Sequence, residues 1–184
     1  MDTRKRIIDT ASRLFYQQGY NSTGINQIIE EADISKASLY QHFKSKEDLL
    51  LEYLQIVYVQ TMLDLRNAAA TGLAVEEKIS AIFRHMSEYA GSKDFCGCNF
   101  LNMAGEIPKE NQRVYELIQR QKNEVRELFT EILTDNKTGK EAKARAEKLA
   151  DGIYLLFDGA LMSCKVYNDA WPALVAQKTA LSLL

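Results

Sequence analysis

The chain has 184 residues, of which 46% are hydrophobic and 26% charged, values typical of a folded protein with a core. Its net charge of −2 excludes binding to nucleic acid or to anionic membranes by bulk charge alone. Three cysteines argue against a secreted disulfide scaffold. No continuous apolar stretch follows the charged residues at the start, as a signal peptide would need, and the most apolar run, 149–164, is too short to span a bilayer. We therefore expect a cytoplasmic protein.

The distribution of charge is more informative than its sum. Residues 1–46 hold seven Lys and Arg against five Asp and Glu, so the acidic excess lies in the rest of the chain. Residues 34–46 contain three lysines and no acidic residue. A locally basic segment on an acidic protein is the pattern expected of a small surface that contacts phosphates.

Apolar residues recur at three- and four-residue steps along the chain, which predicts an all-α protein. The presence of only two prolines agrees with helices. The first predicted helix runs through 7–15 and stops at Gly19, and the second opens at Ser22 or Thr23, whose hydroxyls can cap it. The third covers 36–43 and is capped by Ser35, and the fourth runs from 46 to about 70 and is capped by Ser45. Five more are predicted near 75–91, 98–105, 110–135, 139–167 and 170–184.

The second and third predicted helices are short and are joined by a tight turn at residues 32–35, the spacing of a helix-turn-helix. In such a unit the second helix enters the major groove of DNA. Leu39 and Phe43, four residues apart, would face the core of the head. The exposed side would carry Lys36, Ala37, Ser38 and Gln41.

These residue types suit base edges and phosphates. Lys36 suits guanine acceptors, Gln41 suits adenine, and Ala37 suits the methyl group of thymine. The residues placed for phosphates are Tyr40, Lys44, Lys46 and the hydroxyl of Thr23. Two short helices with a turn also occur in proteins that never bind DNA, so the spacing leaves both interpretations open.

The segments 19–25 and 34–50 closely resemble the DNA-binding head of TetR/AcrR-family regulators. By that resemblance, the operator-contacting positions are Thr23, Lys36, Ala37, Ser38, Tyr40, Gln41, His42 and Lys46. The family usually has glycine in the turn where this chain has Asp33. Asp tolerates the left-handed conformation better than most residues, so we expect the turn to be kept with mild strain.

The resemblance implies an N-terminal three-helix head over 1–46 and a helical body over 47–184 that binds an effector and forms a homodimer. The function it implies is that of a sequence-specific DNA-binding transcriptional regulator, a repressor released from its operator by a small molecule. The implied partners are therefore operator DNA, a second copy of the chain and an unknown effector.

The residues of the body agree with a dimer. The stretch 149–164 is apolar nearly all round, as expected of a helix buried on two sides. The predicted interface residues, from this helix and the last one, are Gly152, Gly159, Ala160, Leu174 and Leu181. The alternative is that both helices pack inside a monomer.

An effector pocket would be lined by aromatic, methionine and cysteine side chains of the body, which also suit an ordinary core. The candidates are Tyr89, Phe95, Cys96, Cys98, Phe100, Met103, Tyr115, Phe129, Tyr154, Phe157 and Met162. Few basic residues lie on these apolar faces, which favours a mostly apolar, uncharged effector.

Cys96 and Cys98 flank Gly97 at the start of a predicted helix. They could sense oxidants or electrophiles, because a thiol near a helix start ionises more readily. They could also bind a soft metal, although the other possible ligands have poor spacing, or they could be small buried hydrophobes. We predict neither a metal nor another cofactor.

Two other classes of protein remain to be weighed. A small helical enzyme would need catalytic groups, and His85 has only Glu88 at helical spacing, while Ser87 would point away from it. No phosphate-cradling loop or paired catalytic carboxylates occur, so the chain is not expected to be an enzyme. A purely structural adaptor would not need the residues of the predicted recognition helix.

Overall fold

The computed structural model describes residues 2–135 and 138–184, and these residues form helices joined by turns. This confirms the predicted all-α class. The chain divides into two compact units: a head unit of Met1–Val59 and Asn99–Gln119, and a body unit of Gln60–Cys98 and Arg120–Leu184. The predicted boundary at residue 46 differs from this division, because later parts of the chain join the head unit.

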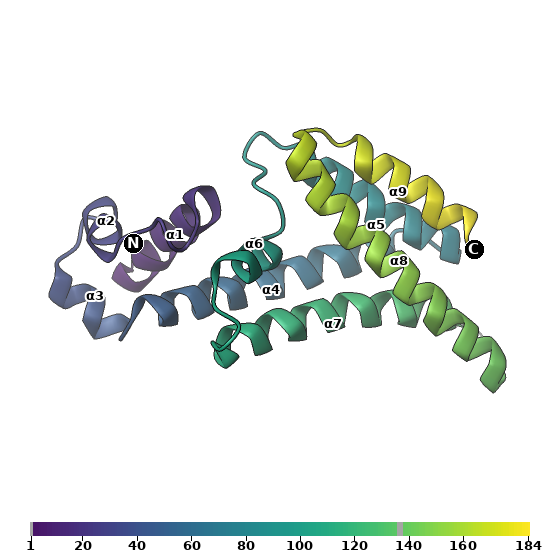
Figure 1. Cartoon of the computed structure of the whole chain (residues 1–184), viewed down its shortest axis with the longest axis horizontal. Coiled ribbons are helices and arrows are strands. Elements are labelled where there is room, and N and C mark those ends of the chain that lie inside the picture. Colours follow the sequence, from purple (N-terminus) through teal and green to yellow (C-terminus); the bar gives the residue numbers. More distant parts are fainter. Residues whose placement is uncertain (1, 136–137) are drawn as a thin grey trace. The chain divides into compact units, whose positions relative to one another are not determined.

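The first three helices of the head unit pack against one another (Figure 1). They are α1 (Thr3–Gln18), α2 (Ile25–Glu31) and α3 (Lys36–His42). The buried side chains of these three helices are Ile7, Ile8, Ala11, Leu14, Phe15, Ile28 and Leu39. Gly19 ends α1 with a φ of 93°, a value that favours glycine.

The start of α2 differs from the prediction. The helix begins at Ile25, its N-cap is Gly24, and it has no side-chain cap. The Thr23 hydroxyl donates a hydrogen bond backwards to the Gly19 carbonyl (2.7 Å) and accepts one from Gln18 Nε2 (3.2 Å). Capping by Ser22 or Thr23 was therefore wrong, because the turn after α1 already uses the Thr23 hydroxyl.

The turn before α3 follows the prediction. Asp33 has a φ of 50°, which confirms the left-handed conformation expected where the family has glycine. This conformation costs a residue with a Cβ about 1–2 kcal/mol, and Asp is among the side chains that tolerate it best. Ser35 then caps α3, since its side chain accepts a hydrogen bond from Ser38 N at 3.1 Å.

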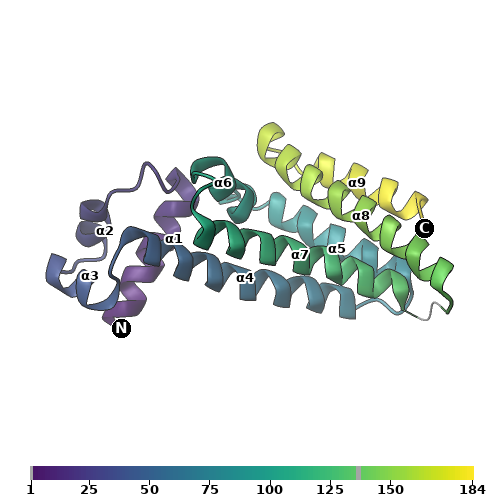
Figure 2. The same ribbon diagram turned by 60° about the horizontal axis from the view of Figure 1, so that its bottom comes forward.

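Two long helices contribute to both units: α4 (Lys46–Ala70) and α7 (Gln112–Thr134). The short α6 (Asn99–Glu106) belongs to the head unit. The body unit adds α5 (Val75–Ala90), α8 (Lys140–Tyr167) and α9 (Trp171–Ser182), which lie side by side in Figures 1 and 2. All five predicted body helices are confirmed to within two residues at each end.

Aromatic rings form the centre of the body unit. The Phe157 ring packs edge-on against Phe83 and Phe129, with centroids 5.8 and 5.7 Å away. Such ring contacts add to the stabilisation from burying apolar area. In the part of the chain that the structure describes, no helix is both long and apolar enough to cross a bilayer.

Candidate nucleic-acid interface

Two buried side chains fix the recognition helix α3 to the head. Leu39 and Phe43 are buried, which turns the other side of the helix to solvent. The exposed residues of this side are Lys36, Ala37, Tyr40, Gln41, His42 and Lys44, and Ser38 is half-buried. Of the nine residues predicted to contact DNA, six lie on α3, Lys44 follows it, and Lys46 is the first residue of α4; all eight are at least partly exposed.

Helical spacing orders these side chains into rows. Ala37 and Gln41 are one turn apart, and Lys36 and Tyr40 form a neighbouring row. Their combination of a cation, an amide and a methyl group matches the donors, acceptors and apolar contacts that base edges offer in the major groove.

Thr23 lies elsewhere. Its side chain is 1% exposed, and both of its hydrogen bonds stay within the turn between α1 and α2. The hydroxyl is therefore engaged within the head in this structure, and its predicted contact with a phosphate stays a prediction. The sequence pattern could not show this, because a threonine before a helix usually caps it from the surface.

Lys46 is only partly available. It is half-buried, and its ammonium lies 4.1 Å from the centroid of the Tyr20 ring, a cation–π contact. Burial lowers the pKa of Lys46, while the carboxylate of Glu106 opposes the shift. Lys44 is exposed, so it is the better placed of the two lysines for a phosphate.

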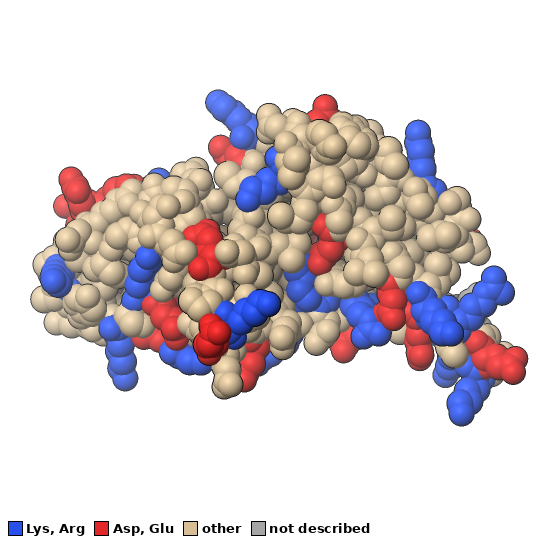
Figure 3. Space-filling model, viewed as in Figure 1, with Lys and Arg blue, Asp and Glu red and all other residues tan. Residues whose placement is uncertain are grey.

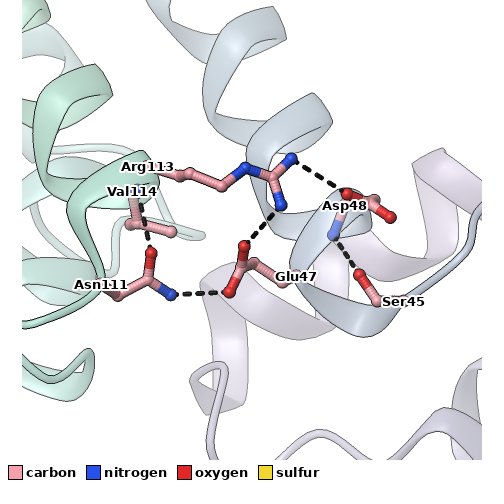
Figure 4. Close-up of polar contacts among 6 residues, drawn as sticks. All are labelled: Ser45, Glu47, Asp48, Asn111, Arg113 and Val114. Carbon is pink, nitrogen blue, oxygen red and sulfur yellow. Dashed lines mark hydrogen bonds and ion pairs between the residues drawn. The ribbon is translucent and has the colours of Figure 1, made fainter.

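The start of α4 is tied to the start of α7 by a polar cluster that the sequence did not reveal (Figure 4). The Arg113 guanidinium donates to Glu47 Oε1 (2.8 Å) and to Asp48 Oδ1 (3.2 Å). Asn111 Nδ2 donates to Glu47 Oε2 at 2.7 Å. These contacts hold the helix that follows α3 in place from outside the three-helix head.

Asp48 has a second partner in this cluster. Its backbone N–H donates to the Ser45 side chain at 3.0 Å, the predicted N-cap of α4. Hydrogen bonding to Ser45 first, and then to Arg113, lowers the pKa of the Asp48 carboxyl. Because this pKa is lowered on folding, the carboxylate contributes to stability at neutral pH and loses that contribution as the pH falls through the lowered value.

The loop between α1 and α2 is tied to the last residue of α6. The Asn21 backbone N–H donates to Glu106 Oε2 (2.8 Å), and Asn21 Nδ2 donates to the Glu106 carbonyl (3.0 Å). Glu106 also lies close to Gly19: a Cβ built on this glycine would come within 2.7 Å of Glu106 Oε1. Asn21 and Glu106 are 85 positions apart in the sequence, so helical periodicity cannot predict their contact.

The predicted effector-pocket residues fall in both units. Phe100, Met103 and Tyr115 belong to the head unit, and the Tyr115 hydroxyl donates to the Ala104 carbonyl at 2.9 Å. The others belong to the body unit: Tyr89, Phe95, Cys96, Cys98, Phe129, Tyr154, Phe157 and Met162. Within it, Tyr89 packs against Phe95, and Phe129 packs against Phe157.

A polar cluster lies among the apolar residues of the body unit. The Lys122 ammonium donates to Asp158 Oδ1 (2.8 Å) and to Cys98 Sγ (3.4 Å), and the Tyr154 hydroxyl donates to Asp158 Oδ2 (2.9 Å). Burial, and then the Asp158 charge, raise the pKa of Tyr154, so its hydroxyl stays a donor. The sequence named Cys98 and Tyr154 but missed the lysine and the aspartate.

The predicted dimer residues differ in their exposure. Gly159 and Leu174 are exposed, and Gly152 and Leu181 are half-buried. Ala160 is only 7% exposed and packs within its own subunit, so we omit it from the candidate surface. Leu155 and Val166, which were not predicted, are 67% and 75% exposed.

Comparison with known proteins places the chain in a family. A family model described as bacterial regulatory proteins, tetR family, matches residues 7–53. A second, described as transcriptional regulator LmrA/YxaF-like, C-terminal domain, matches residues 75–179.

Within residues 2–135 and 138–184, no group of three or more His, Cys, Asp and Glu is arranged to hold a metal ion.

The chain is 28% identical to the HTH-type transcriptional regulator LmrA of Bacillus subtilis over 177 residues, which cover 94% of this chain and 92% of LmrA. It is 37% identical over 98 residues to YuxN, an uncharacterised HTH-type regulator of the same organism, in a match that spans 51% of this chain and 33% of YuxN. The crystal structure of SCO4454, a TetR-family regulator from Streptomyces coelicolor, is similar with a TM-score of 0.84 at 27% identity, covering 98% of this chain and 91% of that one.

The two family models together account for the helix-turn-helix and for most of the body. The regulators they describe bind DNA, form dimers and are not enzymes, which agrees with the sequence prediction. This chain belongs to the TetR family of bacterial transcriptional regulators.

Proposed function

We propose that this chain is a dimeric repressor that reads its operator with α3 and releases it when a small molecule binds to the body. The observation that carries the proposal is the division of α3 into a buried side of Leu39 and a solvent side of polar and cationic residues. Only Leu39 on α3 and Phe43 directly after it are buried, so most of the helix surface is free to enter the major groove, and Lys44 follows it.

The roles of the exposed residues follow from their chemistry. Lys36, Ala37 and Gln41 read bases, with Ser38 and His42 as neighbours on the same helix. Tyr40, Lys44 and, to a smaller extent, Lys46 contact phosphates, which fix the position of the helix without reading sequence.

Substitution on α3 tests this assignment. Lys36→Ala and Gln41→Ala should each reduce the preference for the operator over a mutated operator. The difference in binding free energy between these two DNA sequences should fall by about 1–3 kcal/mol. Lys44→Ala should weaken binding to both and lower the slope of log affinity against log salt by about 1, whereas Lys46→Ala should lower it less. The measurement is fluorescence anisotropy with DNA from upstream of the chain's own gene. Equal weakening by all four variants, without any change in preference, would show that the base readers are misassigned.

The dimer surface that we propose combines the outer sides of α8 and α9. Its α8 residues are spaced at three and four positions on one face: Gly152, Leu155, Gly159, Met162 and Val166. From α9 it includes Leu174, which is exposed, and Leu181. In Figure 3 the surface over the later part of α8 and over α9 is largely uncharged, whereas the first turns of α8 carry both signs. Leu155, Val166 and Leu174 are exposed apolar side chains of this surface, and exposed apolar side chains that gather in this way are typical of a protein interface.

Effector recognition is supported by Gln121 in the body unit. Its side chain is 3% exposed, and its Oε1 has no hydrogen-bond partner among the described residues. It shares a face of α7 with Leu117 and Val125, which are buried. A buried acceptor without a partner costs stability, and such costs are typical of binding sites. We infer that the effector is mostly apolar and has a hydrogen-bond donor for this oxygen.

Replacing Gln121 should therefore stabilise the protein in the absence of effector. Gln121→Leu is expected to raise the free energy of unfolding by about 1 kcal/mol, because it removes an unsatisfied buried acceptor. Gln177→Leu is the matched control, since Gln177 Nε2 donates to the Ser80 carbonyl (3.0 Å) and hydroxyl (2.8 Å). The control should lower the free energy of unfolding by about as much. Urea unfolding measures both, and a loss in Gln121→Leu as large as in the control would contradict the inference.

A further inference from the structure

One side of α4 carries apolar side chains that are exposed to solvent. Ile56, Val59 and Leu63 are 48%, 60% and 52% exposed, whereas Leu54 and Met62 on other sides of the same turns are buried. A helix with apolar residues all round is normally buried all round. Single exposed apolar residues are common, but three that are neighbours on one helix face form a patch, and such a patch is typical of an interaction site.

The patch has the spacing of a coiled-coil seam. Alternating steps of four and three residues lead along α4 from Glu52 through Ile56, Val59 and Leu63 to Arg66. Residues at these steps lie on one face of a helix, where they can pack against the same face of a second helix. No charged residue lies between Glu52 and Leu63. The seam therefore has an apolar centre and a charge at each end, which is the composition expected of an interface core with a polar rim.

The charges at the two ends are opposite and lie at equal distances from the centre. Glu52 lies seven residues before Val59 and Arg66 lies seven residues after it, about two turns in each direction. In an antiparallel pair of α4 helices centred on Val59, Glu52 of each copy therefore faces Arg66 of the other, and Ile56 faces Leu63. A parallel pair would instead bring like charges together at both ends. Such self-complementarity is what a two-fold contact between identical chains requires, and the charges fix its orientation.

Both end charges already have one partner within the subunit. Glu52 is paired with Arg4 (2.9 Å), and Arg66 is paired with Glu131 (2.9 Å). The Glu52 and Arg66 side chains nevertheless stay 34% and 45% exposed, so each can take a second partner. An ion pair between copies would join the two existing pairs into a network of four charges. Networks of this kind contribute more than isolated surface pairs do.

We propose that the seam of Glu52, Ile56, Val59, Leu63 and Arg66 is a second self-association surface, which binds the same seam of another copy of this chain in antiparallel orientation. Since α8 and α9 carry the proposed dimer surface, the α4 contact joins one dimer to another. Three apolar side chains from each copy make a small contact, and small contacts are weak and transient. The α4 contact therefore forms at higher protein concentration than the dimer does.

The first test is sedimentation velocity of the full chain over a range of protein concentrations. The dimer should associate further with a dissociation constant on the order of 0.1 mM. Val59→Glu places a carboxylate at the centre of the seam and should weaken this association at least about tenfold without dissociating the dimer. Asn123→Glu is the matched control, because it adds the same charge at an exposed position of α7 outside the seam, and it should leave the association unchanged. Urea unfolding shows whether both variants are folded.

The second test is charge reversal, which reports on the antiparallel orientation. Glu52→Arg brings two arginines together at each end of the contact, and Arg66→Glu brings two glutamates together, so each variant alone should associate about fivefold more weakly. An equimolar mixture of the two variants has opposite charges at both ends and should regain the association of the parent chain. The mixture does not restore the ion pairs lost within each subunit, so this recovery reports on the contact between copies. No association of the parent chain below about 1 mM, an unchanged dissociation constant in Val59→Glu, or a mixture as weak as its components would each overturn the proposal.

Discussion

Gly159→Glu is expected to convert the dimer into a folded monomer and to weaken operator binding about a thousandfold, to the level of non-specific binding. Gly159 is exposed on α8, and apart from its chain neighbours and the nearby backbone of α8, no described atom lies within 4 Å of the position that its Cβ would take. The subunit therefore accommodates the new side chain, and glutamate favours a helix over glycine. In the proposed dimer, each copy would place an unpaired carboxylate in an apolar interface, which is strongly unfavourable.

Sedimentation equilibrium measures whether the variant is a monomer, urea unfolding measures whether it is folded, and fluorescence anisotropy measures its affinity for operator DNA. Gly159→Ala is the control, because it changes the glycine without adding charge and should keep the dimer. A charge at Ala160 tests folding instead of assembly, since that side chain is buried within the subunit. A monomeric Gly159→Glu protein that still binds the operator tightly would contradict the proposed interface.

Gly19→Ala is expected to destabilise the head by about 2–3 kcal/mol and to weaken operator binding. One part of the cost is the backbone, because φ at Gly19 is 93°. The other part is the approach of Glu106, whose Oε1 would lie 2.7 Å from the new Cβ. Glu106 could move aside only by giving up its hydrogen bond with the Asn21 N–H.

A double-mutant cycle separates these two costs. In a Glu106→Ala background, Gly19→Ala should cost about 1 kcal/mol less, because only the backbone strain remains. Gly24→Ala is the control in the same loop, since Gly24 has a φ of −87° and, apart from its chain neighbours, no atom within 4 Å of its Cβ position. Because Gly24 is the N-cap of α2, where Ala is disfavoured, this variant should lose about 1 kcal/mol or less. Urea unfolding gives the free energy of unfolding of the four proteins of the cycle and of the Gly24→Ala control. Equal costs of Gly19→Ala in both backgrounds would show that the Glu106 contact does not constrain the loop.

Features set by neighbouring residues could be predicted from the sequence. The helices follow from apolar periodicity, and the Ser35 and Ser45 caps follow from their place before helices. The left-handed Asp33 was expected from the resemblance to a family that usually has glycine at this position. The error at α2 is also local. Thr23 had two possible uses, capping the next helix or bonding the preceding carbonyl, and nothing in the sequence distinguishes them.

Contacts between distant segments could not be predicted in this way. The Arg113 pairs with Glu47 and Asp48, and the Lys122 pair with Asp158, join residues on different helices. Charged residues on a helix face usually point to solvent, so a sequence pattern gives no reason to prefer one partner over another. Polar residues such as glutamine are also mostly exposed, so no pattern in the sequence indicates that Gln121 is buried on an otherwise apolar face of α7.

The way in which α3 is held has a consequence for how this regulator can evolve. Its attachment depends on Leu39 and on Phe43 directly after it, whereas the side chains at 36, 37, 40 and 41 contribute little to the core. Substitutions at these four positions are therefore nearly free of a folding penalty, because surface replacements usually change stability by less than about 0.5 kcal/mol. After gene duplication, changes at these positions could give one copy a preference for a different operator sequence. The fold of its head, its dimer surface and its response to the effector would stay the same.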